Sequence, residues 1–97
     1  MFIVLLRLSD NSENAPDFME AHKAWLQQGF DEGAFLLAGR LTDVGGGLLV
    51  AGDDLAEVEA RIAADPIVIN DVARPEILEI TPSMASKDFQ FLLGDDA

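Results

Sequence analysis

The sequence predicts an α+β domain in which two helices cover one face of a four-stranded antiparallel sheet. Four short apolar runs have the length and composition of strands. Two longer segments repeat apolar residues every three or four positions, which is typical of amphipathic helices. The elements follow one another in the order β-α-β-β-α-β, which is the ferredoxin-like, or split βαβ, arrangement.

The first half of the chain predicts a strand, a helix and a second strand. Residues 2–8 are almost continuously apolar, so we expect a central strand that is buried on both faces. Pro16 suits the first turn of a helix, where its missing N–H costs nothing, and this helix is expected over residues 16–30. Gly33 is expected to end it in the left-handed conformation. Residues 34–41 predict the second strand.

Glycines mark the connection to a third strand at residues 48–51. Gly39, inside the second strand, indicates close approach of another backbone or of a ligand. The three glycines at residues 45–47 lack the Lys-Ser/Thr of a phosphate loop and join strand to strand. We therefore expect them to form the flexible turn of a β-hairpin.

The second half of the chain predicts another helix and a last strand. Asp54, with Glu57 three residues later, has the spacing of a capping box at a helix start. Pro66 is expected to end this helix, because proline disfavours helical geometry in the residue before it. A loop over residues 67–73 and a fourth strand over residues 74–81 complete the domain.

Composition restricts the class of protein. The chain has 97 residues, 49% of them hydrophobic, with 6 Lys+Arg against 18 Asp+Glu and a formal net charge of −12. This acidity disfavours binding to nucleic acid or to anionic membranes, because phosphates would be repelled. There is no cysteine, so neither a disulfide framework nor a thiolate site is available. Without a signal-peptide or membrane-span pattern, we expect a soluble cytoplasmic protein.

The apolar character of the strands predicts a homodimer. Helices on one sheet face would leave the other face as a large apolar patch, which two subunits would bury by packing their sheets together. We expect residues 1–82 to form the domain and residues 83–97 to form a tail that is partly docked. Phe89 and Phe91 lie in this tail, and we expect them to pack on the body of the domain or on the partner subunit.

His22 and Asp65 are the candidate catalytic residues. His22, the single histidine, lies on the apolar face of the first helix, where it is either a satisfied core residue or a general acid/base. Asp65 continues the apolar stripe of the second helix at the end where a negative charge opposes the helix dipole. It either forms a local Asp-Pro turn or meets His22, because both helices lie on the same sheet face.

Other residues are candidates for binding a substrate. Arg40 follows Gly39 at the end of the second strand, where it forms either an ordinary ion pair or a site for an anionic substrate group. Gly39 and Trp25, which shares the helix face of His22, are further candidate contacts. No metal site is expected, since one histidine and no cysteine leave mainly oxygen ligands. Proton-transfer chemistry at such a site would need no cofactor.

Four stretches of the chain form a family-like pattern: PDFMEAHKAWLQQGFDEGAFLLAGRL, GGGLLVAG, LAEVEARIAADP and EILEITP. Together they resemble the YCII-related family of small dimeric ferredoxin-like (α+β barrel) proteins, over roughly residues 1–82. The resemblance implies that His22 and Asp65 form a catalytic or ligand-binding pair. The chain departs from the family pattern at Arg40, where proline is usual, and at Ile67, where phenylalanine is usual.

Two functions follow from these observations. The first is a small cofactor-independent enzyme that uses His22 and Asp65 for proton transfer on a small, anionic or ring substrate. The family resemblance implies lyase, isomerase or dehydrohalogenase-like chemistry of this kind. The second is a non-catalytic small-ligand-binding or accessory protein that uses the same pocket. An enzyme requires that His22 is reachable from solvent and has room for a substrate beside it.

Overall fold

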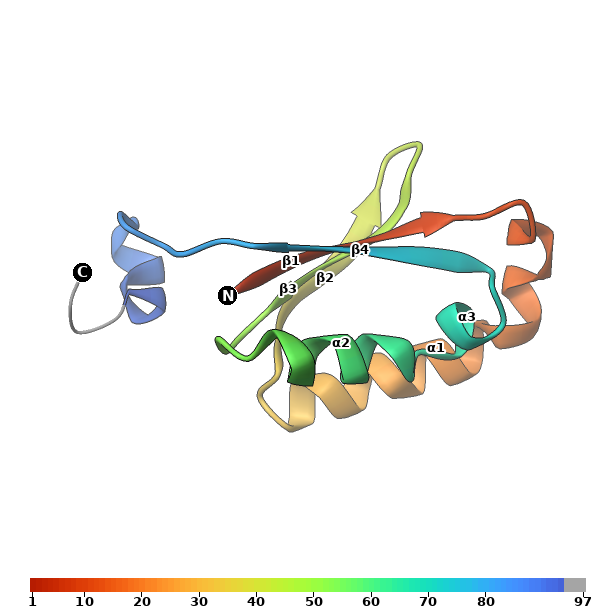
Figure 1. The fold of residues 1–97 in the computed structure, drawn as a ribbon, viewed down its shortest axis with the longest axis horizontal. Coiled ribbons are helices and arrows are strands. Elements are labelled where there is room, and N and C mark those ends of the chain that lie inside the picture. The colour runs from red at the N-terminus through yellow and green to blue at the C-terminus, as the bar shows by residue number, and fades with distance from the viewer. Residues whose placement is uncertain (94–97) are drawn as a thin grey trace.

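The computed structural model describes residues 1–93, which form a four-stranded antiparallel sheet with the strand order β2-β3-β1-β4 (Figure 1). The strands are β1 (Phe2–Leu8), β2 (Phe35–Leu41), β3 (Gly45–Val50) and β4 (Ala73–Glu79). The helices are α1 (Ala15–Asp31), α2 (Leu55–Ala63) and the short α3 (Pro66–Ile69), and η1 (Ser12–Asn14) and η2 (Lys87–Leu92) are 3₁₀ helices. This order and topology confirm the predicted ferredoxin-like α+β fold.

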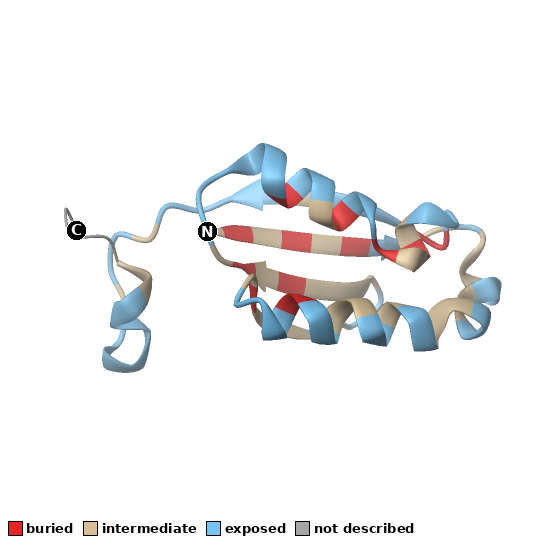
Figure 2. Cartoon of the chain, turned by 90° about the horizontal axis from the view of Figure 1, so that it is seen from below, coloured by how far each residue is buried: buried red, intermediate tan, exposed pale blue. Residues whose placement is uncertain are grey.

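All three α-helices lie on one face of the sheet, so the domain has two layers (Figure 1). The core lies between them, where alternate residues of β1 are buried while the outer surfaces of the helices are exposed (Figure 2). Fully or almost fully buried apolar side chains come from both layers: Phe2, Val4, Leu6, Phe35, Leu48, Val50, Val58, Ile62, Ile67 and Val72. The helix-covered face of the sheet therefore carries the hydrophobic core.

β1 is the central strand that the sequence predicted, but only one of its faces is buried within the chain. It lies between β3 and β4, and its burial alternates residue by residue, as expected for a strand with one covered face. On the open face, the register aligns four apolar residues across all four strands: Leu37, Leu49, Ile3 and Leu78. Leu37 is 59% exposed and Leu78 is 47% exposed. We call these four residues the open-face row.

Helix α1 begins and ends close to its predicted limits. Pro16 lies in its first turn, and Gly33 follows its C-cap with a φ of 75°, as predicted. Gly29 is the one buried residue of α1. A Cβ at this position would collide with the ring of Phe35, so glycine lets α1 approach β2 closely.

The predicted glycine turn is wrong. Residues 45–47 belong to β3, where Gly45, Gly46 and Gly47 pair with β1, and the turn is made by residues 42–44. Asp43 takes a positive φ of 63° in that turn. The central strand supplies hydrogen-bonding partners that hold the glycines extended, and local propensity does not include that tertiary contribution.

The prediction for the second helix is confirmed at its start, but the structure differs from it at the end of the helix. Asp54 caps α2 by accepting a hydrogen bond from the backbone N–H of Glu57, as predicted. The stretch after Asp65 was expected to be a loop, but its first part forms the helix α3. Pro66 both prevents α2 from continuing and starts α3, because proline is well suited to the first turn of a helix.

The described part of the tail extends away from the domain (Figure 1). None of the residues of η2 is buried, and Phe89 and Phe91 are 53% and 67% exposed. The two rings lie near each other, with centroids 6.4 Å apart. The tail therefore does not pack on its own domain within the described residues, and docking on a partner subunit stays a prediction. Residues 94–97 of the predicted tail lie outside the described residues.

None of the helices within residues 1–93 has both the length and the apolar composition needed to cross a membrane.

Candidate functional site

His22 and Asp65 meet, as the sequence analysis predicted. His22 projects from the middle of α1, and its Nδ1 lies 2.8 Å from Oδ1 of Asp65, which joins α2 to α3. A carboxylate only accepts hydrogen bonds, so in this pair Nδ1 donates. In the neutral imidazole this leaves Nε2 with a free lone pair. The geometry is that of a base and the group that orients it.

Asp65 is fully buried and holds two segments at once. Its Oδ1 also accepts a hydrogen bond of 3.1 Å from the backbone N–H of Ile67, so Asp65 is the N-cap of α3. The local Asp-Pro turn and the contact with His22 are therefore both present, and they are not alternatives. Asp65 follows the C-terminal end of α2, as expected, and its carboxylate at the same time caps the start of α3.

Oδ2 of Asp65 is buried and has no hydrogen-bond partner within residues 1–93. Leaving a carboxylate oxygen unpaired in the interior costs free energy, about 1–3 kcal/mol. Buried polar groups without a protein partner are uncommon in native proteins, and strain, a catalytic role or a bound water or ion are the usual reasons for them. This second oxygen distinguishes Asp65 from an ordinary helix cap.

Trp25 contacts His22 but lies outside the histidine pocket. Its ring stacks on the imidazole with a centroid distance of 5.7 Å and an angle of 25°. Its Nε1 donates a hydrogen bond of 3.2 Å to the backbone carbonyl of Arg61, and its ring packs on Phe35. Trp25 therefore packs against the His22 ring, and it is not among the residues that line the pocket.

His22 lines a pocket of about 190 Å³ between α1 and the β2–β3–β1 part of the sheet. The side chain of His22 is 12% exposed, so it is reachable and not sealed in the core. The other lining residues are all small or apolar: Leu6, Leu26, Ala38, Gly39, Gly46, Gly47 and Leu48. Asp65 lies behind the ring and does not line the pocket. The arrangement presents one polar, titratable group to an otherwise apolar space.

Gly39 lines this pocket, as expected, whereas Arg40 lies next to it. Arg40 pairs with Gly46 across the β2–β3 ladder, and Gly46 is one of the lining residues. Arg40 is exposed and makes no ion pair with any carboxylate within residues 1–93. The ordinary ion pair weighed for Arg40 is therefore absent from the part of the chain that the structure describes. Because it lies beside the pocket, Arg40 is still a candidate for binding an anionic substrate group.

Gly46 is one of the lining residues that sequence reasoning missed. It was assigned to a turn, and only the register of β3 with β1 and β2 brings it to the pocket. The GGG run was a visible signal, but its place in the sheet depends on pairing between strands distant in sequence.

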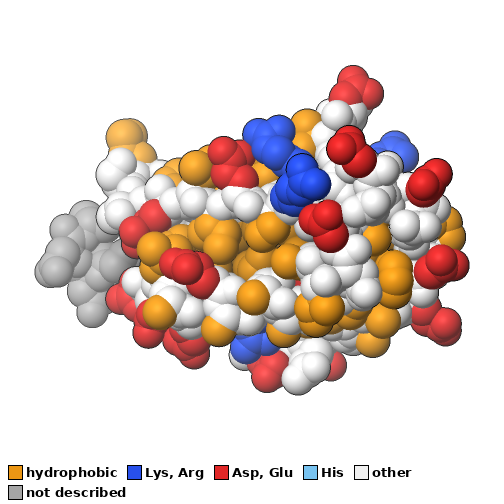
Figure 3. Space-filling model, turned by 45° about the vertical axis from the view of Figure 1, so that its right-hand side comes forward, with side chains coloured by type: hydrophobic (Ala, Val, Ile, Leu, Met, Phe, Trp, Pro, Cys, Tyr) orange, Lys and Arg blue, Asp and Glu red, His pale blue; other side chains and the backbone are white. Residues whose placement is uncertain are grey.

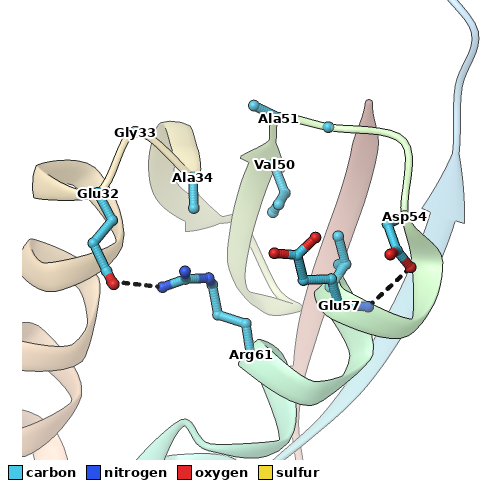
Figure 4. Close-up of a pocket in the computed structure, with 10 residues that line it drawn as sticks. Glu32, Gly33, Ala34, Val50, Ala51, Asp54, Glu57 and Arg61 are labelled. Atoms are coloured by element: carbon cyan, nitrogen blue, oxygen red, sulfur yellow. Dashed lines mark hydrogen bonds and ion pairs between the residues drawn. The ribbon is translucent and has the colours of Figure 1, made fainter.

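A second hollow, of about 280 Å³, lies where the end of α1 meets the start of α2 (Figure 4). Arg61 reaches across from α2 to Glu32 at the C-cap of α1, with 3.2 Å between Nη1 and Oε2. Glu57 points into the same space (Figure 4). These groups are partly exposed, and this pair orients no catalytic base. The hollow is larger than the His22 pocket, but its lining residues include no histidine that could act as a general acid/base.

Within residues 1–93, no three His, Cys, Asp or Glu side chains gather closely enough to hold a metal ion. Figure 3 shows hydrophobic side chains in a band across one side, with acidic side chains along its edge.

The fold and the site define a small α+β protein with an imidazole–carboxylate pair beside an apolar pocket. Residues 1–81 match the YCII-related domain, and the chain belongs to this family. No match was found among curated proteins.

One similar solved structure is 5-chloro-2-hydroxyhydroquinone dehydrochlorinase (TftG) from Burkholderia phenoliruptrix AC1100, in complex with 2,5-dihydroxybenzoquinone. It is 15% identical, has a TM-score of 0.68, and the match covers 81% of this chain and 91% of that chain. At this identity the similarity shows the fold.

Proposed function

We propose that the protein is a small cofactor-independent enzyme that transfers a proton on a small organic substrate. His22 is the general acid/base, and Asp65 is the residue that positions it. The observation that carries the proposal is the 2.8 Å hydrogen bond from His22 Nδ1 to a fully buried carboxylate, made by a histidine that also lines a pocket.

The proposed step uses Nε2 of His22. This nitrogen takes a proton from a C–H or O–H group of the substrate, and the electron pair left behind forms a new double bond or expels a leaving group. The proton on Nε2 makes the ring an imidazolium, which the Asp65 carboxylate stabilises through Nδ1. Returning the proton to another substrate atom completes an isomerisation, and losing it to solvent after departure of an anion completes an elimination. Neither route requires an electron acceptor.

The walls of the pocket favour a ring or another apolar skeleton as the substrate. Leucine, alanine and glycine surround the imidazole, so affinity would come mostly from burying apolar surface. The similar dehydrochlorinase structure contains a single-ring quinone, which supports testing this class of compound. Arg40, unpaired within residues 1–93 and next to the pocket, would hold an anionic substituent.

We further propose that the enzyme is a homodimer whose sheets pack through the open-face row. Leu37, Leu49, Ile3 and Leu78 form an apolar stripe across all four strands. Solvent exposure of such a stripe is unfavourable, and a second copy would bury it. A stable interface of this kind buries at least about 1,000 Å².

A non-catalytic ligand-binding or accessory role is the second candidate function. The observation that favours it is that His22 is the only side chain with a polar group among the residues that line the pocket. Binding an apolar ligand requires no more than that. An elimination usually also benefits from a group that stabilises the developing charge, a role open here to Arg40.

Exchange of hydrogen for deuterium on a substrate analogue separates the two functions. Incubation with 2,5-dihydroxybenzoquinone in D₂O, followed by NMR of its ring protons, reports proton transfer at carbon without any knowledge of the product. The enzyme hypothesis predicts accelerated exchange that His22→Ala abolishes, whereas Lys23→Ala, on the exposed side of α1, leaves the rate unchanged. Binding of the quinone without accelerated exchange would favour the ligand-binding role. Circular dichroism of His22→Ala checks that the variant is folded.

A further inference from the structure

Gly46 is a glycine that the backbone does not require. Its neighbours have local reasons to be glycine: Gly45 has a φ of 147° and a Cβ there would collide with the carbonyl of Leu6, while a Cβ on Gly47 would lie 3.0 Å from Leu41. Gly46 has no left-handed φ, and its added Cβ would come no nearer than 3.8 Å to any heavy atom. That distance is an ordinary contact, so the fold would accept alanine at this position.

The position of Gly46 in the sheet shows where such a side chain would go. Gly46 pairs with Leu6 on β1, and Leu6 is buried on the helix-covered face. Residues paired across a sheet share a face, so a Cβ at position 46 points to the helix side. Gly46 lines the His22 pocket, and the added atoms would therefore enter the space in front of the imidazole.

We propose that Gly46 is a specificity-determining residue, whose missing side chain leaves room for a planar six-membered ring beside His22. An apolar cavity of about 150 Å³ is large enough to hold benzene. The His22 pocket, at about 190 Å³, has room for one ring with small substituents. The bare peptide of Gly46 offers a flat surface to the face of that ring. This inference rests on the proposed function and names the substrate class of the same site.

A graded series of variants tests the proposal. Glycine inside a strand is less favourable than alanine, so Gly46→Ala is expected to keep or raise the melting temperature. The same change is expected to weaken binding of 2,5-dihydroxybenzoquinone about tenfold, the effect of one methyl group in an apolar pocket, and Gly46→Val should weaken it further. Because the chain has a single histidine, the NMR signals of its imidazole report binding at this site directly.

Diethyl pyrocarbonate, which modifies accessible imidazole nitrogen, gives a second measurement that needs no ligand. Wild type is expected to react at His22, and Gly46→Val should react about tenfold more slowly. Ala24→Val adds similar bulk to the exposed side of α1 and should leave the rate unchanged. Equal quinone affinity and equal modification rate in wild type and Gly46→Val would overturn the proposal, as would failure of wild type to bind the quinone.

The proposal and the proposed function fail in different ways. If His22→Ala keeps the hydrogen–deuterium exchange rate, the catalytic role is wrong, whereas the effect of Gly46→Val on quinone affinity is still measured. If Gly46→Val binds as tightly as wild type while His22→Ala loses exchange, the enzyme remains and only the ring specificity at Gly46 is wrong.

Discussion

The two faces of the sheet have similar residues and very different surroundings. On the helix-covered face, Phe2, Val4 and Leu6 are at most 2% exposed. On the open face, the row of Leu37, Leu49, Ile3 and Leu78 is equally apolar, yet two of its members are about half exposed. His22 and Asp65, the imidazole–carboxylate pair of the candidate site, both belong to the covered side.

This difference shows that the apolar composition of a strand does not by itself determine whether each of its faces is buried within the chain. A strand with apolar residues on both faces needs two covering layers, and one chain of this fold supplies one. The covered face builds the core and, between helix and sheet, the His22 pocket. Within residues 1–93 no element covers the open face (Figure 1), which is the physical reason to propose a partner for it.

The largest expected effect is on the covered face. Phe2→Ala removes a fully buried ring and should lower the free energy of unfolding by about 3–5 kcal/mol. The matched change on the adjacent residue of the open face, Ile3→Ala, should cost less in a single chain. In a homodimer its cost should depend on protein concentration, because subunit association contributes to stability. Urea unfolding at two protein concentrations measures both, and a concentration-independent cost for Ile3→Ala would count against the dimer.

Next in size is a charge placed within the open-face row. Leu49→Glu would bury an unpaired carboxylate in the proposed interface, which should raise the dissociation constant of the dimer about 100-fold, or about 3 kcal/mol. Gln28→Glu makes a similar change in charge on the exposed surface of α1 and should not affect assembly. Light scattering over a range of concentrations measures the effect. A wild-type protein that is monomeric at micromolar concentration would refute the dimer.

A smaller effect is expected from the tail. Removing all residues after Pro82 should lower the melting temperature if Phe89 or Phe91 packs on a partner subunit, because burying one such ring fully is worth roughly 1.5–3 kcal/mol. The same truncation in the Leu49→Glu background should have no effect, since docking on a partner requires the dimer. Identical melting curves for the truncated and full-length wild type would show that the tail does not dock.

The smallest expected effect concerns an ion pair on the helix-covered side of the sheet whose side chains are partly exposed to solvent. Glu32→Gln removes the ion pair with Arg61, whose two side chains are 45% and 29% exposed. Exposed ion pairs contribute about 0–1 kcal/mol, so thermal unfolding should change by no more than about 0.5 kcal/mol. A loss above 2 kcal/mol would mean that this pair is as well protected as His22 and Asp65. The exposed fraction of the side chains would then fail to distinguish the Glu32–Arg61 pair from the His22–Asp65 pair.

Sequence reasoning predicted the candidate pair because both residues are locally unusual. His22 is a polar side chain within the apolar stripe of a helix, and Asp65 continues the apolar stripe of the second predicted helix at the end where a negative charge opposes the helix dipole. Each therefore needs a partner, and the β-α-β-β-α-β order places both helical segments on one face of the sheet. Their catalytic role does not follow from these observations and stays a prediction.

The amino-acid sequence by itself determined the order of elements, the central place of the first strand, the cap at Asp54 and the left-handed glycine after α1. These depend on periodicity, on capping and on backbone freedom, which act over a few residues. Tertiary structure alone decided that residues 45–47 are strand, that Asp65 caps a new helix, and that Trp25 turns away from the pocket while Gly46 lines it. Those outcomes depend on pairing and packing between segments far apart in the chain, whose contributions exceed the local preferences of the residues concerned.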